Sequence, residues 1–280
     1  MPQLNFEITI AAPATKVWFM LWDDVTYRKW VSVFNEGSYA VTDWKQTSKV
    51  HFLNPTGDGI YSQITECVPN QKMVFKHIGA IKNFEEQPIT PEFEAWADSF
   101  ESYTLTENNG STTVQVTINA PKEYADYFST TFPKALAMLK TTVETFAITV
   151  TTIVNTTLQQ AWDYWNTPKH IQNWCFASDD WHCPKSSNDL SVGGKLITTM
   201  AAKDGSFSFD FAVKYTAISP LLHIASVGED GRKITVDFTQ QGTSVLITET
   251  FDPETENSIA LQQGGWQAIL NNFNHYVHSL

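Results

Sequence analysis

Two copies of one residue pattern, placed 144 positions apart, dominate this sequence. The first copy has Val17-Trp18 followed after eleven residues by Trp30. The second has Ala161-Trp162 followed after eleven residues by Trp174. A repeat at a fixed spacing is typical of a chain built from related units, so we expect two domains of similar fold.

The predicted domains are residues 1–144 and 145–280, each of ordinary domain size. Each carries a formal net charge of −6 and five Trp, which agrees with a shared origin. The spacing between matching segments falls from 144 to 132 toward the middle of the copies. The first domain therefore has about a dozen additional residues, which we assign to an insertion at Glu85–Pro91.

Both domains are predicted to contain the same elements in the same order. Alternating apolar and polar residues indicate strands, Asn or Gly between two such runs indicates a hairpin, and apolar residues at helical spacing indicate helices. Pro133 is expected in the first turn of the main part of its helix, which would begin at Thr130 or Thr131. The strand, short helices, hairpin and closing helical stripe are expected at 6–10, 17–22, 100–118 and 128–143, and again at 150–154, 158–165, 234–248 and 266–277.

This order of elements predicts an α+β fold, in which one closing helix is left to cover the apolar face of an antiparallel sheet. A strongly bent sheet closing on one helix is not filled completely by side chains of modest size. We therefore expect a pocket between the helix and the sheet.

The second half also resembles a known family. It is similar to the AHSA1-like domain, named for activators of the Hsp90 ATPase, which is a branch of the START-like (SRPBCC, Bet v 1-like) helix-grip superfamily. The first half is similar only in layout, because it lacks the Gly-Gly pair and the Gly-Trp-Gln motif. The resemblance covers nearly all of 148–280 and is carried by Trp174, Asp179-Asp180-Trp181-His182, Val192-Gly193-Gly194-Lys195, Ala202-Lys203-Asp204-Gly205-Ser206, Phe209-Asp210-Phe211 and Gly265-Trp266-Gln267.

The resemblance implies two tandem helix-grip domains, each a curved antiparallel sheet wrapped around a long C-terminal helix, with a deep apolar cavity. The aromatic and aliphatic stripes are the candidate ligand-binding residues, and the alternative is that each residue is simply part of the core. The candidates are Trp30, Phe132, Leu136 and Leu139 in the first domain, and Trp174, Trp181, His182, Met200, Phe209, Phe211, Trp266, Ile269, Leu270 and Phe273 in the second.

The charge of −12 disfavours nucleic acid and anionic membranes as partners, because both repel an acidic surface. The sequence lacks an apolar run long enough to cross a bilayer and a secretory signal at its start. Three Cys without dense spacing require no disulfide framework. We therefore expect a cytoplasmic protein.

Neither a cofactor nor a metal is predicted, and no catalytic residue is assigned. His170, Cys175, His182 and Cys183 have suitable ligand atoms for zinc but not the usual spacing. We expect the acidic residues to lie in solvated loops, and we keep His182 open as a base or an orienting group. These acidic residues are Asp179, Asp180, Glu85, Glu86, Glu92, Glu94 and Asp98.

Three functions remain open from the sequence. The first is binding of a small apolar or aromatic molecule in a cavity between helix and sheet. The second, implied by the resemblance, is interaction with an Hsp90-type chaperone. The third is an enzyme of the cyclase or hydrolase type, which a polar cluster at the floor of the cavity would favour.

Overall fold

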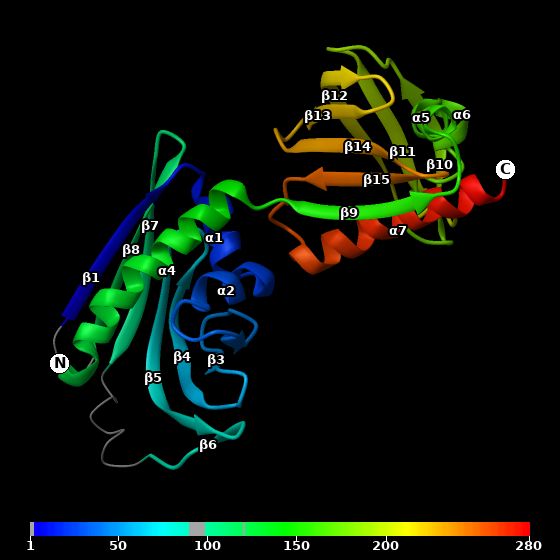
Figure 1. Ribbon diagram of the computed structural model, residues 1–280. Helices are drawn as coiled ribbons and strands as arrows, with labels where there is room; N and C mark the ends of the chain where they lie inside the picture. The colour runs from blue at the N-terminus through cyan, green and yellow to red at the C-terminus, as the bar shows by residue number, and fades with distance from the viewer. Residues whose placement is uncertain (1–2, 90–98, 120) are drawn as a thin grey trace. The chain divides into compact units, whose positions relative to one another are not determined.

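The computed structural model describes residues 3–89, 99–119 and 121–280 of the 280. The chain divides into two compact units, Met1–Phe146 and Ala147–Leu280. Each unit consists of one antiparallel sheet and a long C-terminal helix, as Figure 1 shows. The predicted fold class, two tandem helix-grip domains, is confirmed.

The first domain has an antiparallel sheet in the order β1-β8-β7-β5-β4-β3-β2, with the short β6 paired to β5. The helices α1, α2 and α4 pack against one another. The last residues of the predicted insertion, 90 and 91, lie outside the described residues. The elements are β1 (Gln3–Ile10), α1 (Ala14–Trp22), α2 (Asp24–Val31), β2 (Tyr39–Val41), β3 (Lys49–Leu53), β4 (Gly59–Val68), β5 (Lys72–Lys82), β6 (Glu85–Glu86), β7 (Phe100–Asn108), β8 (Ser111–Asn119), η1 (Lys122–Tyr124) and α4 (Ala125–Thr145).

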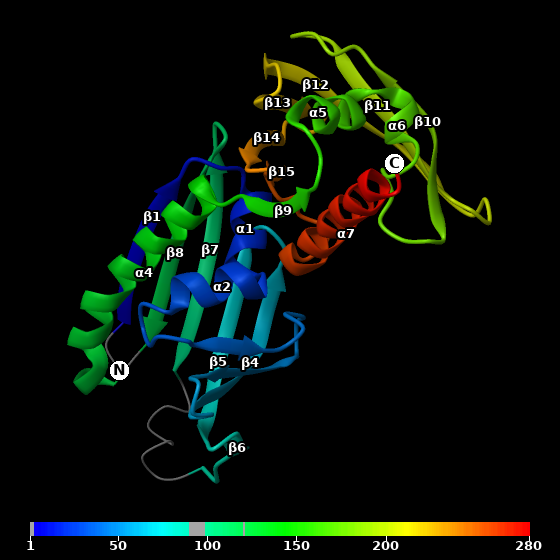
Figure 2. The same ribbon diagram turned by 45° about the vertical axis from the view of Figure 1, so that its right-hand side comes forward.

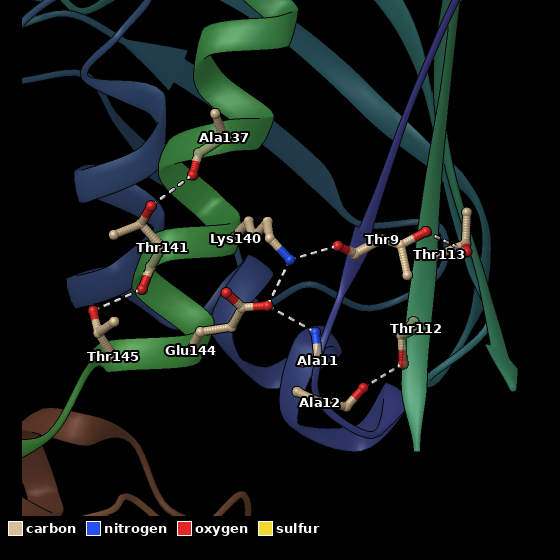
Figure 3. Close-up of polar contacts among 10 residues, drawn as sticks. All are labelled: Thr9, Ala11, Ala12, Thr112, Thr113, Ala137, Lys140, Thr141, Glu144 and Thr145. Atoms are coloured by element: carbon tan, nitrogen blue, oxygen red, sulfur yellow. Dashed lines mark hydrogen bonds and ion pairs between the residues drawn. The ribbon is translucent and has the colours of Figure 1, made fainter. Parts of the chain in front are cut away.

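Polar contacts hold α4 against β1 at the end of the first domain (Figure 3). The ammonium of Lys140 donates to the carbonyl of Thr9 at 2.8 Å and pairs with the carboxylate of Glu144 at 2.6 Å. The same Glu144 oxygen accepts from the backbone N–H of Ala11 at 2.8 Å. These contacts anchor the helix where the sheet edge turns into α1.

The helix α4 begins earlier than the sequence suggested, because it is continuous from Ala125 with Pro133 inside it. A proline in a helix interior lacks one N–H donor and costs about 3 kcal/mol. Burial of the neighbouring Phe132 and Leu136, which are 2% and 1% exposed, offsets that cost. The prediction that the main helix starts at Thr130 or Thr131 is therefore wrong, since tertiary packing outweighs the local penalty.

The second domain has a sheet in the order β10-β11-β12-β13-β14-β15-β9, with every neighbouring pair antiparallel. In both ribbon views α7 lies along β9, and β10 to β13 curve away from it (Figures 1 and 2). The elements are β9 (Ile148–Val154), α5 (Leu158–Asn166), α6 (Pro168–Ile171), β10 (Trp181–Asn188), β11 (Lys195–Ala202), β12 (Ser208–Ser219), β13 (His223–Gly228), β14 (Lys233–Gln241), β15 (Ser244–Phe251) and α7 (Ile259–His278).

Local sequence signals account for several of the boundaries. Asn109 and Gly110 take positive φ values of 51° and 75° in the turn between β7 and β8, as the hairpin prediction requires. Thr157 and Gln160 form a reciprocal capping box at the start of α5. In the first domain, by contrast, Pro13 precedes α1 without a side-chain cap.

None of the described helices combines the length and apolarity needed to span a membrane.

Candidate functional site

The second domain contains a cavity of about 640 Å³ between α7 and the curved sheet. This volume falls in the range of small-molecule sites, which hold about 300–1,000 Å³. Seven of the predicted candidates line it, on the segment after α6, on β10 to β12 and on α7. They are Trp174, Trp181, Met200, Phe209, Phe211, Trp266 and Ile269.

The exposure of the cavity-lining side chains decreases along β12. Alternate residues of this strand face the cavity, because side chains in a strand point to one face with a period of two. Phe209 is 42% exposed, Phe211 is half-buried, and Val213 and Tyr215 are each 4% exposed. The cavity therefore opens near Phe209 and is closed near Tyr215.

The open end is framed by aromatic rings. Trp181, Phe207 and Phe209 form a mutual cluster with centroid separations of 6.1 to 6.2 Å, and Phe207 is 60% exposed. Deeper inside, the ring of Trp266 stacks on Phe251 at 4.0 Å. The wall thus offers aromatic surface along its length.

The remaining candidates lie elsewhere. Leu270 and Phe273 are fully buried, and Phe273 packs against the Trp174 ring with centroids 5.0 Å apart. His182 is half-buried on β10 but does not line the cavity. Trp30, Phe132, Leu136 and Leu139 are all at most 2% exposed and belong to the core of the first domain.

A buried carboxyl group, which sequence reasoning missed, lies in the cavity wall. Glu249 on β15 is 7% exposed, and its strand neighbours are Val236 on β14 and Val150 on β9. Burial raises the pKa of Glu249 from 4.5 to about 8. Within residues 3–89, 99–119 and 121–280, no hydrogen bond or ion pair reaches its carboxyl group.

The sequence does carry a signal for Glu249. Val245, Ile247, Glu249 and Phe251 alternate with more exposed residues along β15, so a charged residue occupies a position on the apolar face. The predicted strand ends at 248, one residue before Glu249, so the sequence prediction does not include this carboxyl group.

Other polar groups line the cavity near its closed end. The hydroxyl of Tyr215 donates to Asn188 Oδ1 at 2.8 Å, and its pKa is raised by burial to about 12. Thr198 is 1% exposed, and its Oγ1 makes no hydrogen bond of normal geometry to the described residues. It lies close enough to the Cys175 thiol to lower the pKa of that thiol slightly.

The cysteines are suited to packing rather than to attack on a substrate. Burial raises the pKa of Cys175 well above its usual range, and the neighbouring Cys183 and Glu249 raise it further. Because the thiolate is the nucleophile, Cys175 is unreactive at neutral pH.

The residues considered for zinc do not converge. His170 Nδ1 is bonded to the hydroxyl of Tyr276 at 2.6 Å. In the part of the chain that the structure describes, no three His, Cys, Asp or Glu side chains are grouped as a metal site requires. Of the acidic residues considered, Glu92, Glu94 and Asp98 lie outside the described residues.

The first domain also buries a carboxyl group, but one that is paired. Glu101 accepts a short hydrogen bond from the hydroxyl of Tyr103, and burial raises its pKa to about 7. Nearby, His77 Nδ1 is bonded to Ser62 Oγ at 2.8 Å, and burial lowers the pKa of His77 to about 4. Glu101 and His77 are thus each bonded to a side chain of their own domain, in contrast to Glu249.

Comparisons with known proteins agree with this geometry. Residues 155–278 match the model of the family described as activator of Hsp90 ATPase homolog 1-like protein. A search of curated proteins found no match.

Three solved structures illustrate the relationship. The AHSA1-like protein from Aeromonas hydrophila is 40% identical over 48% of this chain and 93% of that protein, with a TM-score of 0.46. A protein from Cytophaga hutchinsonii is 48% identical over 47% and 92%, with a TM-score of 0.43. The di-domain ARO/CYC BexL from the BE-7585A biosynthetic pathway is 14% identical over 100% and 98%, with a TM-score of 0.39.

Two of these relatives are 40% and 48% identical to this chain over more than nine-tenths of their own length, and the family model matches 155–278. The chain therefore belongs to the family of activator of Hsp90 ATPase homolog 1-like proteins.

Proposed function

We propose that this protein binds a small apolar or aromatic molecule in the cavity of its second domain. The observation that carries this proposal is the cavity of about 640 Å³ with an aromatic wall and an open end near Phe209. An apolar enclosure with few polar groups is the usual character of a small-molecule site.

Two physical features support binding over catalysis. The Cys175 thiol is protonated at neutral pH, so the cavity offers no activated thiolate. Among the residues that the structure describes, no hydrogen bond or ion pair reaches the Glu249 carboxyl. Such a group can hydrogen-bond or pair with a ligand without further machinery.

The test is a titration of the full chain with N-phenyl-1-naphthylamine, a neutral apolar probe whose fluorescence rises in apolar surroundings. We expect saturable binding, and native mass spectrometry should find one probe per chain. No saturable binding, or a signal that grows linearly with probe, would contradict the proposal.

A matched pair of substitutions locates the probe. Met200→Trp enlarges a side chain in the cavity wall, and Met138→Trp makes the same change on α4 of the first domain, where Met138 is 36% exposed. We expect M200W to weaken binding roughly tenfold or more, about 1.4 kcal/mol, and M138W to leave it unchanged. Equal affinities in the two variants would place the probe outside the cavity.

A second candidate function is interaction with an Hsp90-type chaperone, which the description of the matched family supports. Its test is the ATPase rate of purified Hsp90 with and without the full chain. An unchanged rate at saturating concentration would count against this function and would leave ligand binding untouched.

A further inference from the structure

The cavity wall contains a buried carboxyl group that no hydrogen bond or ion pair reaches from the residues that the structure describes. Glu249 is 7% exposed and lies between the valines of two neighbouring strands, Val236 and Val150. An unpaired buried acid destabilises the folded chain, and such groups are concentrated at functional sites.

We propose that the ligand of this cavity is a hydrophobic molecule bearing a protonated amine, and that its nitrogen pairs with the Glu249 carboxylate. The inference rests on the proposed function, and it names the chemical class of the ligand.

The charges around the cavity favour a cation over an anion. Residues 145–280 contain thirteen acidic and seven basic side chains, so the field of the domain attracts positive charge. The one guanidinium in the described wall, Arg232, is already paired with Asp230 at 2.6 Å. Glu254, also in the wall, accepts from the backbone N–H groups of Glu256 and Asn257.

Aromatic rings strengthen the preference for a cation. The rings of Trp174, Trp266 and Phe211 line the same cavity as Glu249. A cation near a ring face gains about 0.5 to 2 kcal/mol, most with Trp. A neutral or anionic head group would not gain this term.

Binding exchanges a proton for the ligand. In the empty cavity at pH 7 the Glu249 side chain carries a proton, because its pKa is about 8. An ammonium ion that binds displaces this proton: the O–H bond of the acid breaks, the proton leaves to solvent, and the carboxylate accepts a hydrogen bond from the ammonium N–H. The nitrogen remains protonated throughout.

The other titratable groups in the described wall do not obscure this exchange between pH 6 and 8. Burial raises the pKa of the Cys175 thiol and of its neighbour Cys183, so both stay protonated. The pKa of Tyr215 is about 12. Arg232 and Glu254, the other charged groups of the described wall, are bonded to Asp230 and to the backbone of Glu256 and Asn257.

The test compares 1-naphthylmethylamine with 1-ethylnaphthalene, two probes of similar shape that differ in the ammonium group. On the unmodified full chain we expect the amine to bind more tightly. Glu249→Gln keeps the size of the side chain and should weaken the amine by roughly 10- to 100-fold while sparing 1-ethylnaphthalene. Glu256→Gln, which removes an exposed charge of the same domain, should change neither affinity.

Calorimetry of the unmodified chain gives a second readout that does not depend on the folding of a variant. Titrations at pH 7 in two buffers of different ionisation enthalpy should report release of close to one proton per amine bound and none for 1-ethylnaphthalene.

Three results would overturn the inference. Equal affinity of the two probes, without proton release, would leave ligand binding intact and remove the role of Glu249. Tighter binding of 1-acetylnaphthalene, lost above pH 8, would make Glu249 a donor to a carbonyl oxygen instead. Failure of both naphthalene probes and of N-phenyl-1-naphthylamine would refute the proposed function itself.

Discussion

Burial of the Glu249 carboxyl should make the stability of the second domain fall as pH rises. In the unfolded chain this side chain ionises near pH 4.5, and in the folded domain near pH 8. Between these values the unfolded chain has lost a proton that the folded chain keeps, so rising pH favours unfolding. Above about pH 8 both states are ionised, and the effect becomes constant.

The size of the effect follows from the two pKa values. Over the interval from pH 5 to pH 8, linkage between 4.5 and about 8 amounts to a loss of about 3.5 kcal/mol. The amide side chain in the Glu249→Gln variant does not titrate. The unfolding free energy of this variant therefore lacks the pH dependence that Glu249 contributes. We therefore expect the unmodified second domain to lose about 3.5 kcal/mol relative to E249Q over this interval.

Urea unfolding of the full chain at pH 5, 6, 7 and 8 measures this difference. A short deuterium pulse at one fixed pH labels the unfolded fraction, and the masses of peptides from 147–280 report the second domain separately from the first. Glu256→Gln serves as the control, because an exposed acid in the same domain should leave the pH dependence unchanged. Unfolding free energies of the unmodified chain and E249Q that run parallel from pH 5 to pH 8 would refute the reasoning.

Three further predictions test the core, a buried pair and a helix cap. Phe273→Ala should destabilise the second domain by about 3 to 5 kcal/mol in urea unfolding, because the ring is fully buried; a loss under 1 kcal/mol would contradict this packing. Tyr103→Phe removes the hydrogen bond that lowers the pKa of Glu101, so a carboxyl titration followed by infrared spectroscopy should show that pKa rising above about 7; an unchanged or lower value disproves the pairing. Thr157→Ala should cost about 1 kcal/mol of second-domain stability by the same urea assay, since it breaks the capping box with Gln160; no measurable loss would show that the cap is dispensable.

Local patterns determine most of the elements of this fold. The turn at Asn109-Gly110 and the capping box at Thr157 are signals contained in a few neighbouring residues, and the structure has both. The glycine pair before β11 acts through the backbone, since Gly193 has a φ of 90°, which favours glycine. Such signals are readable from sequence because their energies depend on short segments.

The helix α4 marks where local rules fail. Proline statistics place a helix start close before Pro133, yet the helix begins at Ala125. Burial of Phe132 outweighs the cost of proline inside the helix. This burial depends on β1, which is far away in the sequence and whose Phe6 stacks on Phe132.

The apolar stripes of the two C-terminal helices show that sequence periodicity also does not locate the binding cavity. Phe132 and Leu136 in the first domain repeat at the same helical spacing as Trp266 and Leu270 in the second, so periodicity cannot separate them. In the structure the first pair is packed in a core, whereas Trp266 lines a cavity of about 640 Å³. The volume of a cavity depends on the positions of many side chains from distant parts of the sequence. A local pattern in one helix therefore does not predict whether a cavity is present.

The sequence by itself determined the tandem repeat and the α+β order of elements, because both depend on patterns within short segments. The alternation along β15 carries a signal for Glu249, but the predicted strand ends one residue before it. Only the tertiary structure decided that this carboxyl would lie in a cavity wall, out of reach of a hydrogen bond or ion pair from the described residues. The sheet must curl and α7 must close over it before water is removed from Glu249, and that removal is what raises its pKa to about 8.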